Sequence, residues 1–158
     1  MPRDLNLVLN DASTAVSTST TGTAINVTGG EFMQFQLFSS VTPTDADETC
    51  TIQIQASFDS GSTWVVVATF PQLSKAANKG NAGTNLAVAC YLPRANTPDP
   101  RGADTPVKVR WKSTVGGTTP SYTLRIEAAP LSATPYGQIG NTGVGRIGML
   151  DNIKNFAA

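Results

Sequence analysis

Short runs of alternating apolar and polar residues recur through residues 1–130. This alternation is the period of a β-strand that buries one face, and no window shows the sustained 3.6-residue period of a helix. The pattern therefore predicts an all-β protein. The expected strands are residues 5–9, 24–27, 32–38, 50–56, 64–70, 86–90, 107–112 and 122–128.

Turn signals between these runs predict three hairpins. Gly29-Gly30 marks the first turn and Val115-Gly-Gly-Thr-Thr-Pro120 the last. Strands with this spacing favour two packed sheets, because each must bury its apolar face against a second layer. We predict an antiparallel β-sandwich, immunoglobulin-like or jelly-roll. The three expected pairs are 24–27 with 32–38, 50–56 with 64–70, and 107–112 with 122–128.

The sandwich body is expected at residues 24–130, with an extended arm at each end. Residues 1–23 join the first strand to a Ser/Thr-rich arm, and residues 93–106 carry four prolines, typical of a surface loop. Residues 131–158 are a glycine-rich arm, too apolar for a solvated tail. We therefore expect the arm to dock on a partner, through Ile139, Val144, Ile147, Met149, Leu150, Ile153 and Phe156.

The most specific local motif is Ser57-Phe-Asp-Ser-Gly-Ser-Thr-Trp64, which resembles the Asp box, Ser-x-Asp-x-Gly-x-Thr-Trp, of sialidases and many unrelated β-proteins. Asp59 is suited to bind backbone amides across a turn, Gly61 to take a positive φ, and Trp64 to cover the hairpin base. We interpret the motif as a structural turn, with a ligand role for Asp59 as the alternative. Its matching residues are Ser57, Asp59, Gly61, Thr63 and Trp64.

The residue inventory argues against an enzyme. The chain has no histidine, so neither a Ser/His/Asp nor a Cys/His arrangement can be assembled. Glycoside hydrolysis needs two facing carboxylates, whereas the acids here lie mainly in expected loops. We predict no catalytic residues and no cofactor. The acids in question are Asp45, Asp47, Glu48, Asp99, Asp104 and Glu127.

Metal binding is not expected either. Cys50 and Cys90 lack the close spacing of a zinc site or a redox pair, so we interpret them as buried free thiols, with a disulfide as the alternative. The Asp45-Ala-Asp47-Glu48 cluster has the oxygen ligands that calcium prefers, but lacks the glycine and distant glutamate of an EF-hand loop. We interpret it as a solvated loop, with a calcium site as the alternative.

Charge is sparse and balanced. Lys plus Arg and Asp plus Glu number 11 each, so no net positive field favours nucleic acid as a partner. The charged fraction is 14%, against about 25% in a typical domain, which suits neutral protein contacts. Lys108, Arg110 and Lys112, with Arg125 on the next expected strand, make one sheet face basic. That face is either solvated or docked on an acidic surface.

The N-terminal apolar stretch, Leu5 to Leu9, is too short for a signal peptide or a transmembrane span. We therefore expect a protein made in the cytoplasm, used outside any secretion route, and not bound to a membrane.

The chain resembles the small β-sandwich decoration or cement proteins of tailed bacteriophages. The likeness lies in the Asp-box hairpin through Thr69, in the runs Val107-Lys-Val-Arg-Trp111 and Ser121-Tyr-Thr-Leu-Arg-Ile126, and in the Ser/Thr/Gly-rich connections. It implies a structural virion protein on the capsid surface that bridges major capsid protein subunits, and we expect a homotrimer. The alternative is a phage tail or baseplate accessory or a carbohydrate-binding module, with Tyr91 and Tyr136 as candidate sugar contacts.

Overall fold

The computed structural model describes residues 7–11, 15–27, 29–40, 43–77, 81–93 and 106–131. Most of the proline-rich loop and the predicted interaction arm from Ile139 to Phe156 lie outside these ranges. No helix in the described part of the chain is long and apolar enough to cross a membrane.

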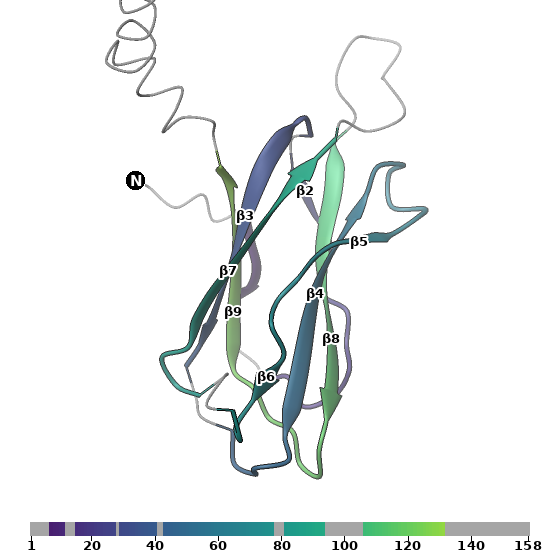
Figure 1. Cartoon of the computed structure of the whole chain (residues 1–158). Coiled ribbons are helices and arrows are strands. Elements are labelled where there is room, and N and C mark those ends of the chain that lie inside the picture. Colours follow the sequence, from purple (N-terminus) through teal and green to yellow (C-terminus); the bar gives the residue numbers. More distant parts are fainter. Residues whose placement is uncertain are drawn as a thin grey trace, which may run out of the picture.

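Two antiparallel sheets pack face to face (Figure 1). The four-stranded sheet has the order β1-β9-β3-β7, and the five-stranded sheet has the order β2-β8-β4-β5, with β6 also paired to β4. The predicted all-β, antiparallel sandwich is confirmed, with nine strands in the described ranges where the sequence predicted eight. The strands are β1 (Val8–Asp11), β2 (Ile25–Val27), β3 (Glu31–Ser39), β4 (Thr49–Ser57), β5 (Val65–Thr69), β6 (Leu73–Ser74), β7 (Asn85–Leu92), β8 (Val107–Gly116) and β9 (Leu124–Leu131).

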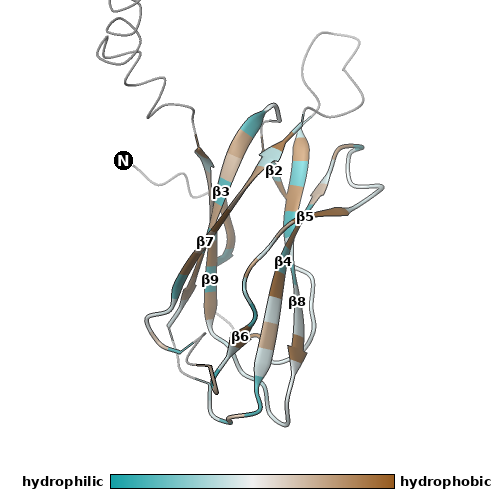
Figure 2. Ribbon diagram, in the orientation of Figure 1, coloured by the Kyte–Doolittle hydropathy of each residue, from teal (hydrophilic) through white to brown (hydrophobic). Residues whose placement is uncertain are grey.

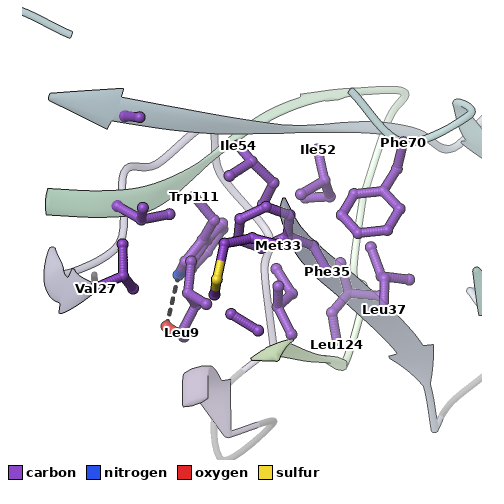
Figure 3. Packing of buried hydrophobic residues seen from close by; sticks show 14 of the residues in the cluster. Leu9, Val27, Met33, Phe35, Leu37, Ile52, Ile54, Phe70, Trp111 and Leu124 are labelled. Atoms are coloured by element: carbon purple, nitrogen blue, oxygen red, sulfur yellow. Dashed lines mark hydrogen bonds between the residues drawn. The ribbon is translucent and has the colours of Figure 1, made fainter. Parts of the chain in front are cut away.

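The core lies between the sheets and follows the alternation of the sequence. Met33, Phe35 and Leu37 of β3 and Ile52 and Ile54 of β4 are buried in one cluster (Figure 3). Burying one such side chain fully is worth about 1.5–3 kcal/mol. The opposite phase of each strand therefore forms the outer faces of the sandwich.

Trp111 of β8 ties the N-terminal segment to this core. Its indole Nε1 donates a hydrogen bond to the Leu9 carbonyl at 3.0 Å (Figure 3). The Gly22 backbone N–H donates to the Trp111 carbonyl at 2.9 Å. A Cβ at position 22 would lie 1.9 Å from the indole Nε1. Only glycine therefore fits where this segment crosses the tryptophan.

The described residues of the N-terminal segment, 7–11 and 15–23, belong to the sandwich, whereas the sequence predicted a strand followed by an arm. β1 is a strand of the four-stranded sheet, so the body begins before the predicted boundary at residue 24. The Ser113 N–H donates to the Thr20 carbonyl at 2.8 Å, and Val16 pairs with Tyr122. Residues 19–22 thus cover the edge of β8 where its short partner β2 ends, and this covering satisfies backbone groups that an open edge would expose.

Two of the three predicted hairpins are wrong. β4 and β5 do pair, with Ala56 opposite Val65. β2 pairs with β8, whereas β3 lies between β7 and β9 in the other sheet. β8 and β9 also belong to different sheets. A glycine-rich turn reverses the chain, but it does not determine whether the next strand stays in the same sheet or crosses to the facing one.

Candidate functional site

The Asp-box turn joins β4 to β5 and is held by its own side chains. Asp59 Oδ1 accepts hydrogen bonds from the Ser57 hydroxyl at 2.7 Å and from the Thr63 N–H at 2.8 Å. Asp59 Oδ2 accepts from the Thr63 hydroxyl. Gly61 has φ of 101° and donates its N–H to Ser57 Oγ at 2.8 Å. The motif therefore uses its polar groups to close the turn.

The same hydrogen bonds lower the pKa of Asp59 and so favour its charged form. The hydrogen bonds from Thr63, first from its side chain and then from its backbone, lower the pKa of Asp59 from 3.8 to about 2, with Ser57 contributing further. Both carboxylate oxygens are engaged within the turn, so an external ligand would have to displace these donors.

Trp64 leaves the turn on the outer face of the five-stranded sheet, half-buried and not in the core. Its indole Nε1 donates to the Gly61 carbonyl at 3.1 Å. The Arg110 guanidinium carbon lies 3.9 Å from the centroid of the Trp64 ring. The Arg110 Nε also donates to Gln55 Oε1 at 2.9 Å. Trp64 thus links the Asp box to a basic residue of β8 through a cation–π contact.

A cationic strip, which we define as Lys108, Arg110 and Lys112, follows the outer face of β8. The residues opposite them on β4 are the neutral Ser57, Gln55 and Gln53. No acidic side chain of the described ranges forms an ion pair with the strip. Arg125 does not join it, contrary to the prediction, because β9 lies in the other sheet. Three of the four predicted basic residues therefore share this face.

An aromatic row, which we define as Phe32 and Tyr91, lies at one end of the outer face of the four-stranded sheet, with Leu131 beside it. Phe32 of β3 is paired with Tyr91 of β7 on one side and with Leu131 of β9 on the other. Phe32 and Tyr91 are 54% and 52% exposed. Their ring centroids are 5.2 Å apart at an interplanar angle of 62°. Two large rings thus contact each other edge to face in solvent.

Next to the aromatic row this face carries small and amide side chains, and its charged residues, Asp11, Arg125 and Glu127, lie further along β1 and β9. β7, apolar along most of its length in Figure 2, exposes Ala87 and Ala89 beside Gln36 and Gln34 of β3. The ion pair of Arg125 with Glu127 stands further from the aromatic row, toward the other end of β9. Small side chains next to amides allow another protein surface to approach closely while its polar groups are still satisfied.

Sequence reasoning missed most of this face. It named Tyr91 as a sugar contact, but it treated Phe32 only as part of a strand. The signal was present, because Phe32 and Phe38 fall on the same phase as Gln34 and Gln36 and not on the phase of the buried side chains. An aromatic residue on the polar phase of a strand lies on the outer face, where Phe32 is exposed and Phe38 is half-buried.

The remaining chemistry-bearing groups do not form a reactive centre in the described ranges. Cys50 and Cys90 are free thiols, on β4 and β7 of different sheets, and burial raises the pKa of Cys50 to about 12. Of the acidic cluster, Asp47 accepts hydrogen bonds from Thr118 and Asp45 from Thr119. No described group of three or more His, Cys, Asp or Glu side chains is arranged to hold a metal ion.

A shallow hollow beside the β1 edge is lined by Asn10, Asp11 and Arg125 with the neighbouring Val8 and Leu9. In the interior, Glu48 is fully buried, and both its carboxylate oxygens and the Tyr122 hydroxyl lack a hydrogen-bond partner among the described residues. Burial, with Cys50 and Glu48 contributing, raises the pKa of Tyr122 to about 12.

No family model matches the chain, and neither does any curated protein. One similar solved structure contains the CBM22-1 and GH10 modules of the N-terminal endo-1,4-beta-D-xylanase 10B of Clostridium thermocellum, complexed with xylohexaose. The identity is 11% and the TM-score is 0.40, over 80% of this chain and 27% of that chain. A likeness of this strength carries no argument about ligand or activity.

Proposed function

We propose that this protein is a non-enzymatic structural component of a tailed-phage virion that decorates the capsid surface. In this proposal the outer face of the β1-β9-β3-β7 sheet docks on the major capsid protein. The observation that carries the proposal is the exposed aromatic pair, Phe32 and Tyr91, next to the uncharged side chains of Gln34, Ala89 and Ala129.

Exposed aromatic pairs of this kind are costly in water and valuable in an interface. Tyrosine and phenylalanine are enriched at the centres of protein interfaces, where charged residues are depleted. The alanines next to Phe32 and Tyr91 leave both rings raised above the sheet, able to enter a pocket of a partner. If several linked copies bind the lattice at once, weak single contacts can together give stable attachment. The predicted homotrimer would serve the same purpose.

A binding assay with phage heads that lack the protein tests this function. We expect saturable co-sedimentation at a fixed ratio to the major capsid protein, and loss of binding in the double variant F32S/Y91S. The matched control is V65S/V66S, which removes side chains of similar exposure, 46% and 49%, from the other sheet. Heads that bind no wild-type protein would reject the proposal.

A carbohydrate-binding module is the second candidate, because Tyr91 lies diagonally across from the amide of Gln34, and an aromatic ring with a nearby amide is a common way for proteins to hold sugars. The angle of 62° between the two rings opposes it, since they form no common platform for sugar stacking. Glycan-array binding that disappears in Y91A would favour this candidate over decoration.

A further inference from the structure

The cationic strip of β8 lies on the opposite side of the sandwich from the aromatic row. We propose that Lys108, Arg110 and Lys112 bind an extended acidic segment of the major capsid protein, with carboxylates on alternate residues. The identity of this partner rests on the proposed function, but the chemistry of the strip can be tested without it. Two faces that bind different subunits would let one molecule bridge them.

The spacing of the strip selects the shape of its partner. Alternate residues of a strand point to the same side and lie about 6.6–6.8 Å apart. Lys108, Arg110 and Lys112 are three such residues of β8. An extended segment with Asp or Glu at every second position repeats at the same interval, so all three contacts can form together. A segment with adjacent carboxylates cannot match more than part of the strip.

The strip has no internal counter-charge. On the neighbouring strands, Asn26 of β2 lies opposite Lys108, and Gln53 of β4 lies opposite Lys112. The nearest acidic side chain in the Asp box, Asp59, has both oxygens committed to the turn. Three like charges in a row repel one another, and an acidic partner relieves that repulsion while it forms its own contacts.

Arg110, at the centre of the strip, is already oriented. Stacking on Trp64 and the bond from Nε to Gln55 fix the plane of the guanidinium, and its terminal nitrogens make no hydrogen bond to a described residue. A fixed guanidinium loses little freedom on binding and offers a forked pair of donors that suits a carboxylate. The Asp box therefore helps to orient Arg110, while its own carboxylate is engaged within the turn.

Fluorescence anisotropy with a labelled (Thr-Glu)5 peptide tests the strip. We expect saturable binding that weakens as salt is added, and an affinity about tenfold lower in K108S/K112S, from two exposed charge contacts. The single variants K108S and K112S are each compared with K75S, which also removes one lysine charge, because Lys75 bonds the Thr44 carbonyl away from the strip. R110K keeps the charge but loses the fork, and we expect it to bind the peptide more weakly than wild type.

A peptide of the same composition with paired glutamates, (Thr-Thr-Glu-Glu)2-Thr-Glu, tests the spacing, and an oligothymidine tests the chemical class of the partner. Equal binding of either would overturn the proposal in favour of a general affinity for polyanions, and so would equal binding of the first peptide by K108S/K112S. Head sedimentation separates the two proposals. If heads bind K108S/K112S as well as they bind the wild type, the strip has no role in attachment, but the proposed decoration of the capsid still stands. If the wild type binds the peptide but not the heads, the proposed decoration is rejected, but the strip still binds acidic segments.

Discussion

The two outer faces of this sandwich rest on the same core but carry opposite chemistry. The face of the β1-β9-β3-β7 sheet presents Phe32 and Tyr91 among alanines and amides. The face of the other sheet presents a row of three positive charges and no acid on the paired strands. The inner phase of each strand is fixed by packing, so the outer phase is free to differ. Residues that recognise a partner are therefore expected at the outward-facing positions of each strand.

The two faces also differ in the range at which they act on a partner. An aromatic pair gains its energy by leaving water at short range, and its effect depends little on salt. A cationic strip acts over about a Debye length, roughly 8 Å at physiological ionic strength, and governs encounter and register. A protein that bridges two subunits benefits from both kinds of surface.

The largest expected effect is a loss of stability from a substitution that disturbs the core on which both faces rest. G22A places a methyl group where the Trp111 indole lies, so either the ring or the covering segment must move. We expect a loss of about 2–4 kcal/mol in the free energy of unfolding, comparable to other disruptions of a packed core. Urea denaturation measures it. An unchanged midpoint would show that residues 19–22 do not pack as described.

The aromatic face gives the next largest effect, on binding and not on folding. F32S/Y91S should weaken attachment to heads by at least about 2 kcal/mol, roughly 30-fold, as for interface hot spots. The free energy of unfolding should change little because both rings are half exposed. Sedimentation at several concentrations and a parallel urea titration measure the two quantities. A large loss of stability would instead identify the pair as part of the structural core.

The sequence was sufficient for the layers but not for the connections. Alternation in residues 32–38 and 50–56 correctly assigned Met33 and Ile52 to the core, because a period of two has only one buried phase. The pairing of β8 with β2 and β4 depends on contacts between residues far apart in the chain, which no local turn signal encodes.

The candidate faces were predictable to the same extent. Three basic residues on one strand could be recognised in the sequence. Arg125 is absent from their face because β9 belongs to the other sheet, which only the topology shows. The stacking of Arg110 on Trp64 could not be foreseen, because it needs both the β4–β5 turn and the β4–β8 pairing to be known.

Glu48 offers a change in stability that should leave both faces intact. Its carboxylate is fully buried without a hydrogen-bond partner in the described ranges, which costs about 1–3 kcal/mol for a polar group. E48M replaces it with an unbranched apolar side chain of similar length, and we expect the free energy of unfolding to rise by about 1–2 kcal/mol. Thermal unfolding measures the change. A destabilised E48M with normal peptide binding would indicate that the carboxylate is satisfied in solution.

The smallest expected effect concerns the turn that supports the cationic strip. The folded-state pKa of Asp59 is about 2, below its ordinary value of 3.8, so the carboxylate favours the folded state above pH 4 and this contribution disappears as the pH falls toward 2. D59N removes the titrating group, and we expect its free energy of unfolding to vary less with pH between 4 and 2 than that of the wild type. Because Trp64 follows the turn and stacks on Arg110, D59N should also weaken (Thr-Glu)5 binding slightly while head attachment through the aromatic row is retained. Equal pH dependence in the two proteins would mean that Asp59 does not hold the turn in solution, and the orientation of Arg110 would then have to come from Gln55 alone.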